Sequence, residues 1–224
     1  MTDRFYIGID PGQSIDPTAI AAVQRITGTN SKPVFRCGHL ERLPLNTPYP
    51  GIVQHTRRLL SRPPFLGAAE LVLDLTGVGR PVADLFTSEG LYPIKVTITA
   101  GDTATVSDHG VWHVAKLLLV STVQTLLHDG RLHIQKELPE APILKAELED
   151  FRAVVTDSGR WTFGARAGAH DDLVLALALA LWRAMKRTPT IIDPSVLRRS
   201  EQIYDRPTLG SPAMDRMLYG WRKF

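Results

Sequence analysis

Ten consecutive apolar residues at positions 173–182 place the strongest constraint on how this chain can fold. An α-helix built from them is apolar on every face, so it must be surrounded by other elements instead of lying on a surface. The run is too short to cross a bilayer, which needs about 20 residues. We therefore expect a buried helix in the core of a globular protein.

Three polar residues, His170, Asp171 and Asp172, directly precede this apolar run. One acid at this place is explained as a helix N-cap, and the helix dipole also favours negative charge there. The second acid then needs water, a donor or a cation of its own. The pair is either a cap with a solvated neighbour or part of a cation-binding site.

Composition and charge suggest one domain followed by a basic tail. The chain has 224 residues, 44% of them hydrophobic, which is ample for a sizeable core. From residue 183 onward, nine Lys or Arg face four Asp or Glu, although the net charge of the whole chain is only +3. We expect a compact domain over residues 1–188 and a basic tail over 189–224, which suits a polyanionic partner. The single cysteine and the absence of a hydrophobic signal segment predict a cytoplasmic protein without a membrane anchor.

The order of elements follows from hydrophobic periodicity and turn residues. The expected strands are residues 4–10, 18–26, 33–43, a buried strand ending at 74, and 92–98. The expected helices are residues 51–61, 81–88, 109–130, 139–151 and the final helix that begins near 171. Short turns predict that the first three strands form an antiparallel meander, and the later strand, helix, strand order predicts parallel pairing. Residues 152–156 and 160–164 flank "DSG" like a hairpin.

Three antiparallel strands followed by alternating helices and strands is the order of a ribonuclease H-like domain. We therefore expect an α/β fold with a mixed sheet flanked by helices. Asp10 ends the first expected strand and Asp74 ends the fourth, and these two strands lie side by side in that topology. Bare carboxylates about 4 Å apart repel by roughly 4 kcal/mol at an effective dielectric constant near 20. Such a cluster therefore requires a cation.

Three segments resemble the acidic motifs of the nuclease domain of phage large terminases: "IGIDPGQSIDPTAIAAV", "LVLDLTGVGRPVADLF" and "HDDLVLALALA". The intervening "KLLLVSTVQTLLHDGRLHI" and "LKAELEDF" fit the same pattern, so the resemblance covers about residues 5–186. It implies a ribonuclease H-like fold, two divalent ions and cleavage of double-stranded DNA during genome packaging. It also implies a bacterial host cell and, as partners, a separate packaging ATPase, a portal or a small terminase.

In that interpretation the acids are metal ligands. Asp10 would bridge two ions, Asp74 would hold one, and Asp171 or Asp172 would hold the other. Ligation by oxygen alone favours Mg²⁺ or Mn²⁺. Successive helical residues differ by about 100° in direction, so the two adjacent acids cannot face one ion equally. We favour Asp171 as the direct ligand and Asp172 as a cap or a nearby partner.

Other polar residues are assigned weaker roles. Asp16 and His170 are candidates for contacts next to the metal ligands, although each also suits an ordinary turn or exposed loop. We interpret Glu147 and Glu149 as solvated helix positions. Candidate contacts to DNA phosphates are Lys95, Lys116, Arg198 and Arg199.

Alternative functions remain open at this point. The chain lacks a G-x-x-x-x-G-K-[ST] phosphate loop, so we expect an isolated nuclease module that neither binds nor hydrolyses ATP. A Holliday-junction resolvase of the same superfold would use a similar acidic site. A non-catalytic module for DNA binding or packaging assembly would bind DNA without metal. An actin-like kinase also opens with a strand and an acidic turn, but it needs a second such domain and a longer chain.

Overall fold

The computed structural model describes residues 4–12, 16–28, 31–150, 152–155, 161–164 and 170–186, with only the backbone described at 152–155 and 161–164. The predicted boundary between a domain and a tail at residue 188 lies outside these residues, as does the tail. No helix in the described part is both long and apolar enough to span a membrane.

Within these residues, eight strands form one mixed sheet in the order β6-β7-β5-β4-β1-β2-β3-β8. Their bounds are β1 Arg4–Asp10, β2 Ala19–Ile26, β3 Val34–Arg42, β4 Ala69–Asp74, β5 Ile94–Thr99, β6 Ala104–Val106, β7 Trp112–Ala115 and β8 Leu132–Ile134. Strands β1, β2 and β3 pair antiparallel, and β1, β4, β5 and β7 pair parallel. The predicted meander, the parallel crossover and the mixed sheet flanked by helices are confirmed.

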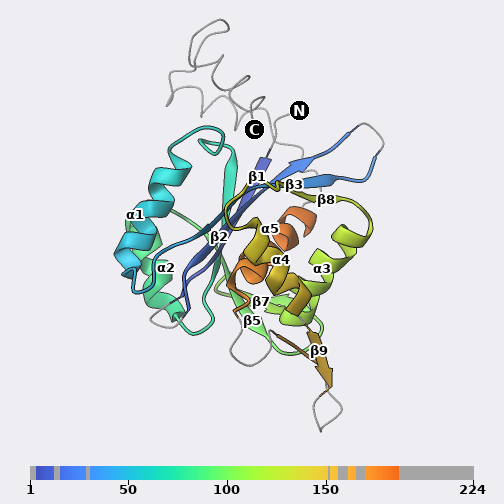
Figure 1. The fold of residues 1–224 in the computed structure, drawn as a ribbon. Helices are drawn as coiled ribbons and strands as arrows, with labels where there is room; N and C mark the ends of the chain where they lie inside the picture. The colour runs from blue at the N-terminus through green and yellow to red at the C-terminus, as the bar shows by residue number, and fades with distance from the viewer. Residues whose placement is uncertain are drawn as a thin grey trace, which may run out of the picture. The chain divides into compact units, whose positions relative to one another are not determined.

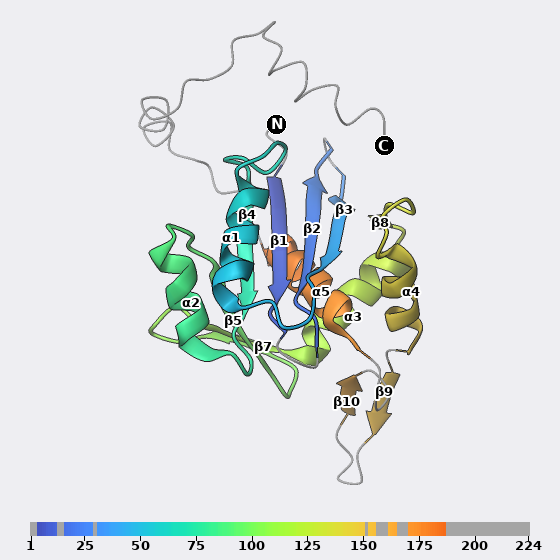
Figure 2. The same ribbon diagram turned by 60° about the vertical axis from the view of Figure 1, so that its left-hand side comes forward.

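Helices cover both faces of this sheet (Figures 1 and 2). One face packs against α1 (Tyr49–Leu60) and α2 (Gly79–Ser88), and the other packs against α3 (Lys116–His128), α4 (Ala141–Asp150) and α5 (Asp172–Lys186). Helix α5 contains the apolar run, and every residue from 173 to 182 is buried. The expectation of a helix surrounded on all sides is therefore confirmed.

Close packing of α5 on β1 requires a glycine. A Cβ atom on Gly8 would overlap the carbonyl oxygen of Ala176 and lie 2.9 Å from the backbone nitrogen of Ala180. Side chains two residues apart on a strand share a face, so Asp10 lies on the same face as Gly8. Asp172 begins α5 one turn before Ala176. This contact therefore brings the end of β1 next to the start of α5.

The prediction for residues 109–130 was wrong in its first part. Residues 112–115 form strand β7, and the helix begins only at Lys116. Strand β7 supplies hydrogen bonds to the edge of β5, with Val96 opposite Trp112 and Ile98 opposite Val114. The pairing with β5 makes residues 112–115 extended, although their apolar residues continue the helical spacing of α3. The three-residue strands β6 and β8 were missed because such short segments carry too little periodicity.

The remaining predicted elements agree with the structure to within a few residues. The hairpin predicted near residues 152–164 is confirmed as β9 (Arg152–Val155) paired antiparallel with β10 (Trp161–Gly164). Helix α4 lies within residues 139–151, and α1 and α2 each begin two residues before their predicted starts. Boundaries of this kind depend on capping and packing more than on periodicity.

The packing at Gly8 yields a stability prediction. Replacing Gly8 with alanine forces α5 away from β1, and we expect this overpacking to cost about 3 kcal/mol of unfolding free energy. Gly51→Ala is the matched control, because a Cβ there meets its nearest neighbour only at 3.5 Å and a helical alanine is intrinsically favourable. Urea denaturation of both variants measures the difference. Equal stabilities for the two variants would contradict the close approach.

Candidate active site

Two acids end neighbouring parallel strands at the same edge of the sheet. Asp10 is the last residue of β1 and Asp74 is the last residue of β4, with Ile9 opposite Leu73 in the preceding register. Because α5 starts beside the end of β1, its first residue joins them. The structure thus brings together acids that are up to 162 residues apart in the sequence.

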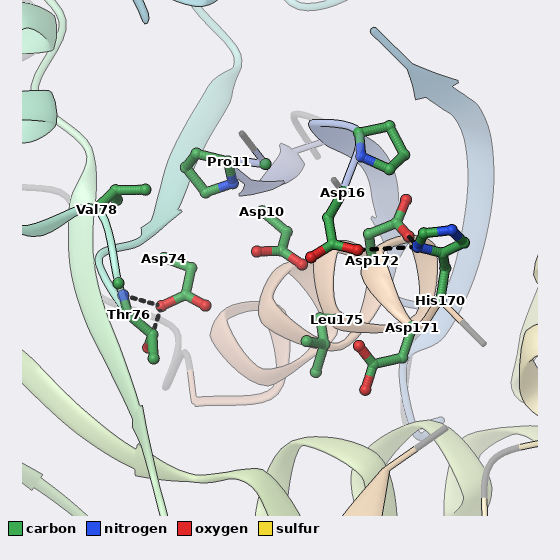
Figure 3. A pocket seen from close by; sticks show the side chains of 13 residues that line it. Asp10, Pro11, Asp16, Asp74, Thr76, Val78, His170, Asp171, Asp172 and Leu175 are labelled. Atoms are coloured by element: carbon green, nitrogen blue, oxygen red, sulfur yellow. Dashed lines mark hydrogen bonds and ion pairs between the residues drawn. The ribbon is translucent and has the colours of Figure 1, made fainter. Parts of the chain in front are cut away.

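These acids line a cleft of about 460 Å³. Its lining residues are Asp10, Pro11, Gly12, Asp16, Pro17, Asp74, Thr76, Gly77, Val78, His170, Asp171, Asp172 and Leu175. Figure 3 shows that the carboxyl groups come from the end of β1, the loop after it, the end of β4 and the start of α5. The convergence predicted from the ends of the strands is therefore present. Whether these acids bind metal stays a prediction.

The carboxyl group of Asp10 lies at the centre of negative charge. Burial raises its pKa well above the ordinary value, and neighbouring carboxylates raise it further. Those neighbours are Asp74, Asp172 and Asp171. Lys116 opposes them, because its positive charge lowers the pKa of Asp10. Burial and the neighbouring carboxylates therefore both disfavour the charged form of Asp10.

Asp74 is held by its own turn. Its Oδ1 accepts hydrogen bonds from the backbone nitrogen of Thr76 at 2.7 Å and from the Thr76 hydroxyl at 2.6 Å. The same hydroxyl accepts a hydrogen bond from the backbone nitrogen of Ile98 at 2.7 Å, which connects the turn to β5. Burial raises the pKa of Asp74, and the Thr76 hydrogen bonds lower it. The carboxyl group therefore has a defined orientation at the cleft.

The two adjacent acids at the start of α5 bind different cations. Asp171 Oδ2 lies 2.6 Å from Nζ of Lys116, the first residue of α3. Asp172 is buried, and both of its oxygens accept hydrogen bonds from Arg42 on β3, at 2.7 Å from Nε and 3.0 Å from Nη2. Their carboxyl groups point in different directions in Figure 3.

The prediction that Glu147 on α4 is a solvated helix position was wrong. It is 5% exposed and not solvated, and its Oε1 pairs with Arg42. Its Oε2 accepts a hydrogen bond from the backbone nitrogen of Val174 at 3.0 Å, so it caps the first turn of α5 from another helix. Burial raises the pKa of Glu147 to about 7. The same prediction for Glu149 is confirmed, because its side chain is exposed.

Sequence reasoning missed Arg42 and Thr76, and it misplaced Glu147. A signal for Glu147 existed, because it follows buried Leu144 by three residues and therefore shares its helix face. Arg42 follows buried Leu40 by two residues on β3, which places both on one face of the sheet. Nothing in either pattern says which acid the arginine binds, because its partners are 105 and 130 residues away.

The structure places the other candidate residues as follows. Asp16 and His170 both line the cleft and pair with each other, with His170 Nδ1 at 3.0 Å from Asp16 Oδ1, and both are exposed. Lys95 lies on β5 and is not among the residues that line the cleft. Arg198 and Arg199 lie outside the described residues.

As they stand, no three histidine, cysteine or acidic side chains within the described ranges converge closely enough to hold a metal ion. The donor set nevertheless suits a hard divalent cation, since carboxylate oxygens dominate the cleft. Asp171 is drawn toward Lys116 and Asp172 toward Arg42, and these ion pairs separate the acids. A divalent ion would therefore need an adjustment of side chains, and it would relieve the repulsion that raises the pKa of Asp10.

Comparison with known proteins adds a family match. The model of the terminase RNase H-like domain family matches residues 68–184, which is over half of the chain. The large terminase subunit of Thermus phage G20c is 27% identical over 114 residues. That match covers 51% of this chain and 20% of the relative, so the matched segment spans about one fifth of that subunit.

Solved structures agree with the fold. The crystal structure of the large terminase nuclease from phage G20c with bound magnesium has a TM-score of 0.61 at 24% identity, and it covers 81% of this chain and 82% of that chain. The cobalt-bound structure of the same nuclease also has a TM-score of 0.61, at 24% identity, with 81% of each chain covered.

The pairing of one arginine with two buried acids yields a second stability prediction. Arg42→Met leaves Asp172 and Glu147 without their shared counter-ion, and we expect a loss of about 3–5 kcal/mol of unfolding free energy in metal-free buffer at pH 8. The loss should shrink near pH 4, where protonated carboxyl groups need no counter-ion. Arg57→Met is the control, since the exposed Arg57–Glu89 pair contributes at most about 1 kcal/mol. Equal losses in the two variants would show that the network is dispensable.

Proposed function

The chain belongs to the family of terminase RNase H-like domains, and from that premise we propose that it is a divalent-metal-dependent endonuclease that cuts double-stranded DNA. One observation carries the proposal: Asp10 and Asp74 end adjacent strands in a cleft that also holds the paired acids at the start of α5. An acidic cluster of this kind, which Lys116 and Arg42 compensate only in part, favours divalent cations and disfavours a substrate phosphate unless such cations are present.

We propose that Asp10, Asp74 and Asp171 would hold two Mg²⁺ or Mn²⁺ ions. The magnesium- and cobalt-bound nuclease of similar fold supports a divalent ion, and the oxygen ligands favour Mg²⁺ or Mn²⁺ over Zn²⁺. When bound, two such ions lower the pKa of an attacking water, bind the scissile phosphate and stabilise the departing 3′ oxygen.

The chain's own residues have separate tasks in this proposal. Thr76 orients Asp74 through two hydrogen bonds, so the carboxylate would bind a metal ion with little loss of conformational freedom. Arg42 and Glu147 hold Asp172 and the first turn of α5, which positions the neighbouring Asp171. His170, paired with Asp16 at the open side of the cleft, is placed to orient a water or a phosphate.

The proposed substrate and partners follow from the family. DNA phosphates would be contacted by basic residues, for which the candidates are Lys95, Lys116, Arg198 and Arg199. We infer that the protein works with a separate packaging ATPase, a portal or a small terminase in the cytoplasm of a bacterial host.

A plasmid-nicking assay tests the proposal. Asp10→Asn keeps the shape of the side chain but removes the charge that holds the ions, so cleavage in Mn²⁺ should fall at least about a hundredfold while the fold is retained. Asp84→Asn on the exposed side of α2 is the control and should cut like the parent. If Asp10→Asn cuts as well as the parent protein, the site is wrong. DNA binding without any cleavage by the parent would instead indicate a non-catalytic module.

A second experiment distinguishes the adjacent acids. Asp171 has one lysine partner and is partly exposed, whereas both oxygens of buried Asp172 are engaged by Arg42. We therefore expect Asp171→Asn to weaken Mn²⁺ binding and abolish nicking. Asp172→Asn should mainly lower stability, by about 3 kcal/mol, because it removes half of a buried ion-pair network. Mn²⁺ titration and urea denaturation measure both effects, and the reverse pattern would make Asp172 the ligand.

A further inference from the structure

One lysine supplies positive charge to acids from three different elements at the cleft. Lys116 Nζ lies 2.6 Å from Asp171 Oδ2 at the start of α5. Its charge also lowers the pKa of Asp10 at the end of β1 and of Asp74 at the end of β4. Lys116 is placed there by the backbone, because β7 runs directly into α3 and the lysine is the first residue of that helix.

This lysine differs from the other cation of the site in how firmly it is held. Arg42 makes a two-pronged contact with Asp172, also binds Glu147, and has a side chain that is 17% exposed. The Lys116 side chain is 29% exposed, and its partner Asp171 is 24% exposed. An ammonium group is a compact charge on a flexible stem, whereas a guanidinium binds a carboxylate in a fixed fork. The ion pair between Lys116 and Asp171 is therefore the one in which another cation can replace the protein's own.

We propose that Lys116 is an internal counter-ion of the acidic cleft, and that a divalent ion must displace its ammonium group from Asp171 in order to bind. This inference rests on the proposed metal-dependent function of the same site. Before the ion arrives, the lysine compensates part of the repulsion among the carboxylates. When the ion takes over that task, the lysine becomes a like charge beside it.

The proposal gives Lys116 opposite effects on two measurable quantities. Removing its charge leaves the metal-free acids less compensated, so the metal-free protein loses stability. The same removal abolishes both the competition for Asp171 and the repulsion of the incoming ion, so the ion binds more tightly. If Lys116 only contacted DNA, or only supported the geometry of the metal ligands, removing its charge would not tighten metal binding.

Calorimetric titration of Mn²⁺ into the full chain tests this. We expect the Kd of Lys116→Gln for Mn²⁺ to fall about two- to fivefold below that of the parent, the size of effect that a partly exposed charge pair produces. Its melting temperature without metal should be lower than that of the parent, and Mn²⁺ should raise it by more. Lys145→Gln is the matched control, because that lysine is 77% exposed on α4 and pairs with Glu149. The control should leave the Kd unchanged.

The outcomes separate this inference from the proposed function. A folded Lys116→Gln protein that binds Mn²⁺ equally or more weakly overturns the counter-ion role while the nuclease proposal stands. A parent protein that binds no Mn²⁺ overturns both.

If Lys116→Gln does not fold, NMR of lysine side chains in the parent replaces it, with Lys116→Arg used to assign the ammonium signal. Titration with Mg²⁺ should then shift the Lys116 Nζ resonance with the same midpoint as metal binding. A resonance that stays unchanged through saturation overturns the displacement.

Discussion

The contact between α5 and β1 at Gly8 is the constraint on which the site depends. Helix α5 is apolar all round and buried over ten consecutive residues, so it must pass through the core with its backbone against the sheet. Only a residue without a Cβ allows that approach at Gly8. Because Asp10 lies two residues further along the same face of β1, the close approach also puts the first turn of α5 beside it. A wider spacing would move Asp171 and Asp172 away from the strand-end acids.

The consequence of this packing is a concentration of negative charge that the protein must compensate. Burial raises the pKa of Asp10, Asp74 and Asp172, which shows that their charged forms are costly in this arrangement. The protein meets this cost in two ways. On the side of β3 and α4, an arginine whose side chain is 17% exposed is shared by two buried acids. On the side of α3, the partly exposed Lys116 pairs with Asp171, which lines the cleft.

This asymmetry agrees with a division of roles between the two neighbouring acids. A carboxylate held in a fork by arginine is well suited to fix the start of a helix, and Glu147 strengthens that end by capping Val174. A carboxylate with one lysine partner can exchange it for a stronger cation. In the proposed nuclease, the metal-free site would therefore be stable enough to fold yet ready to accept divalent ions.

The sequence by itself determined the kind of fold and the edge of the sheet at which the acids meet. Alternating and continuous apolar patterns are local properties, so the meander, the parallel strand ending at Asp74 and the buried last helix could be predicted from them. The ends of parallel neighbouring strands must share an edge, which made the meeting of Asp10 and Asp74 predictable too. Strand β7 was not predicted from the sequence, because pairing with β5, and not its own periodicity, makes residues 112–115 extended.

Only the tertiary structure decided which cation accompanies which acid. Arg42 reaches Asp172 across 130 residues of sequence and Lys116 reaches Asp171 across 55, and no local pattern encodes such distances. The burial of Glu147 was decided in the same way, since Arg42 and the start of α5 lie against it. Charge pairing depends on how whole elements pack, whereas periodicity depends on neighbours along the chain. For that reason the acids of the site were visible in the sequence and their counter-ions were not.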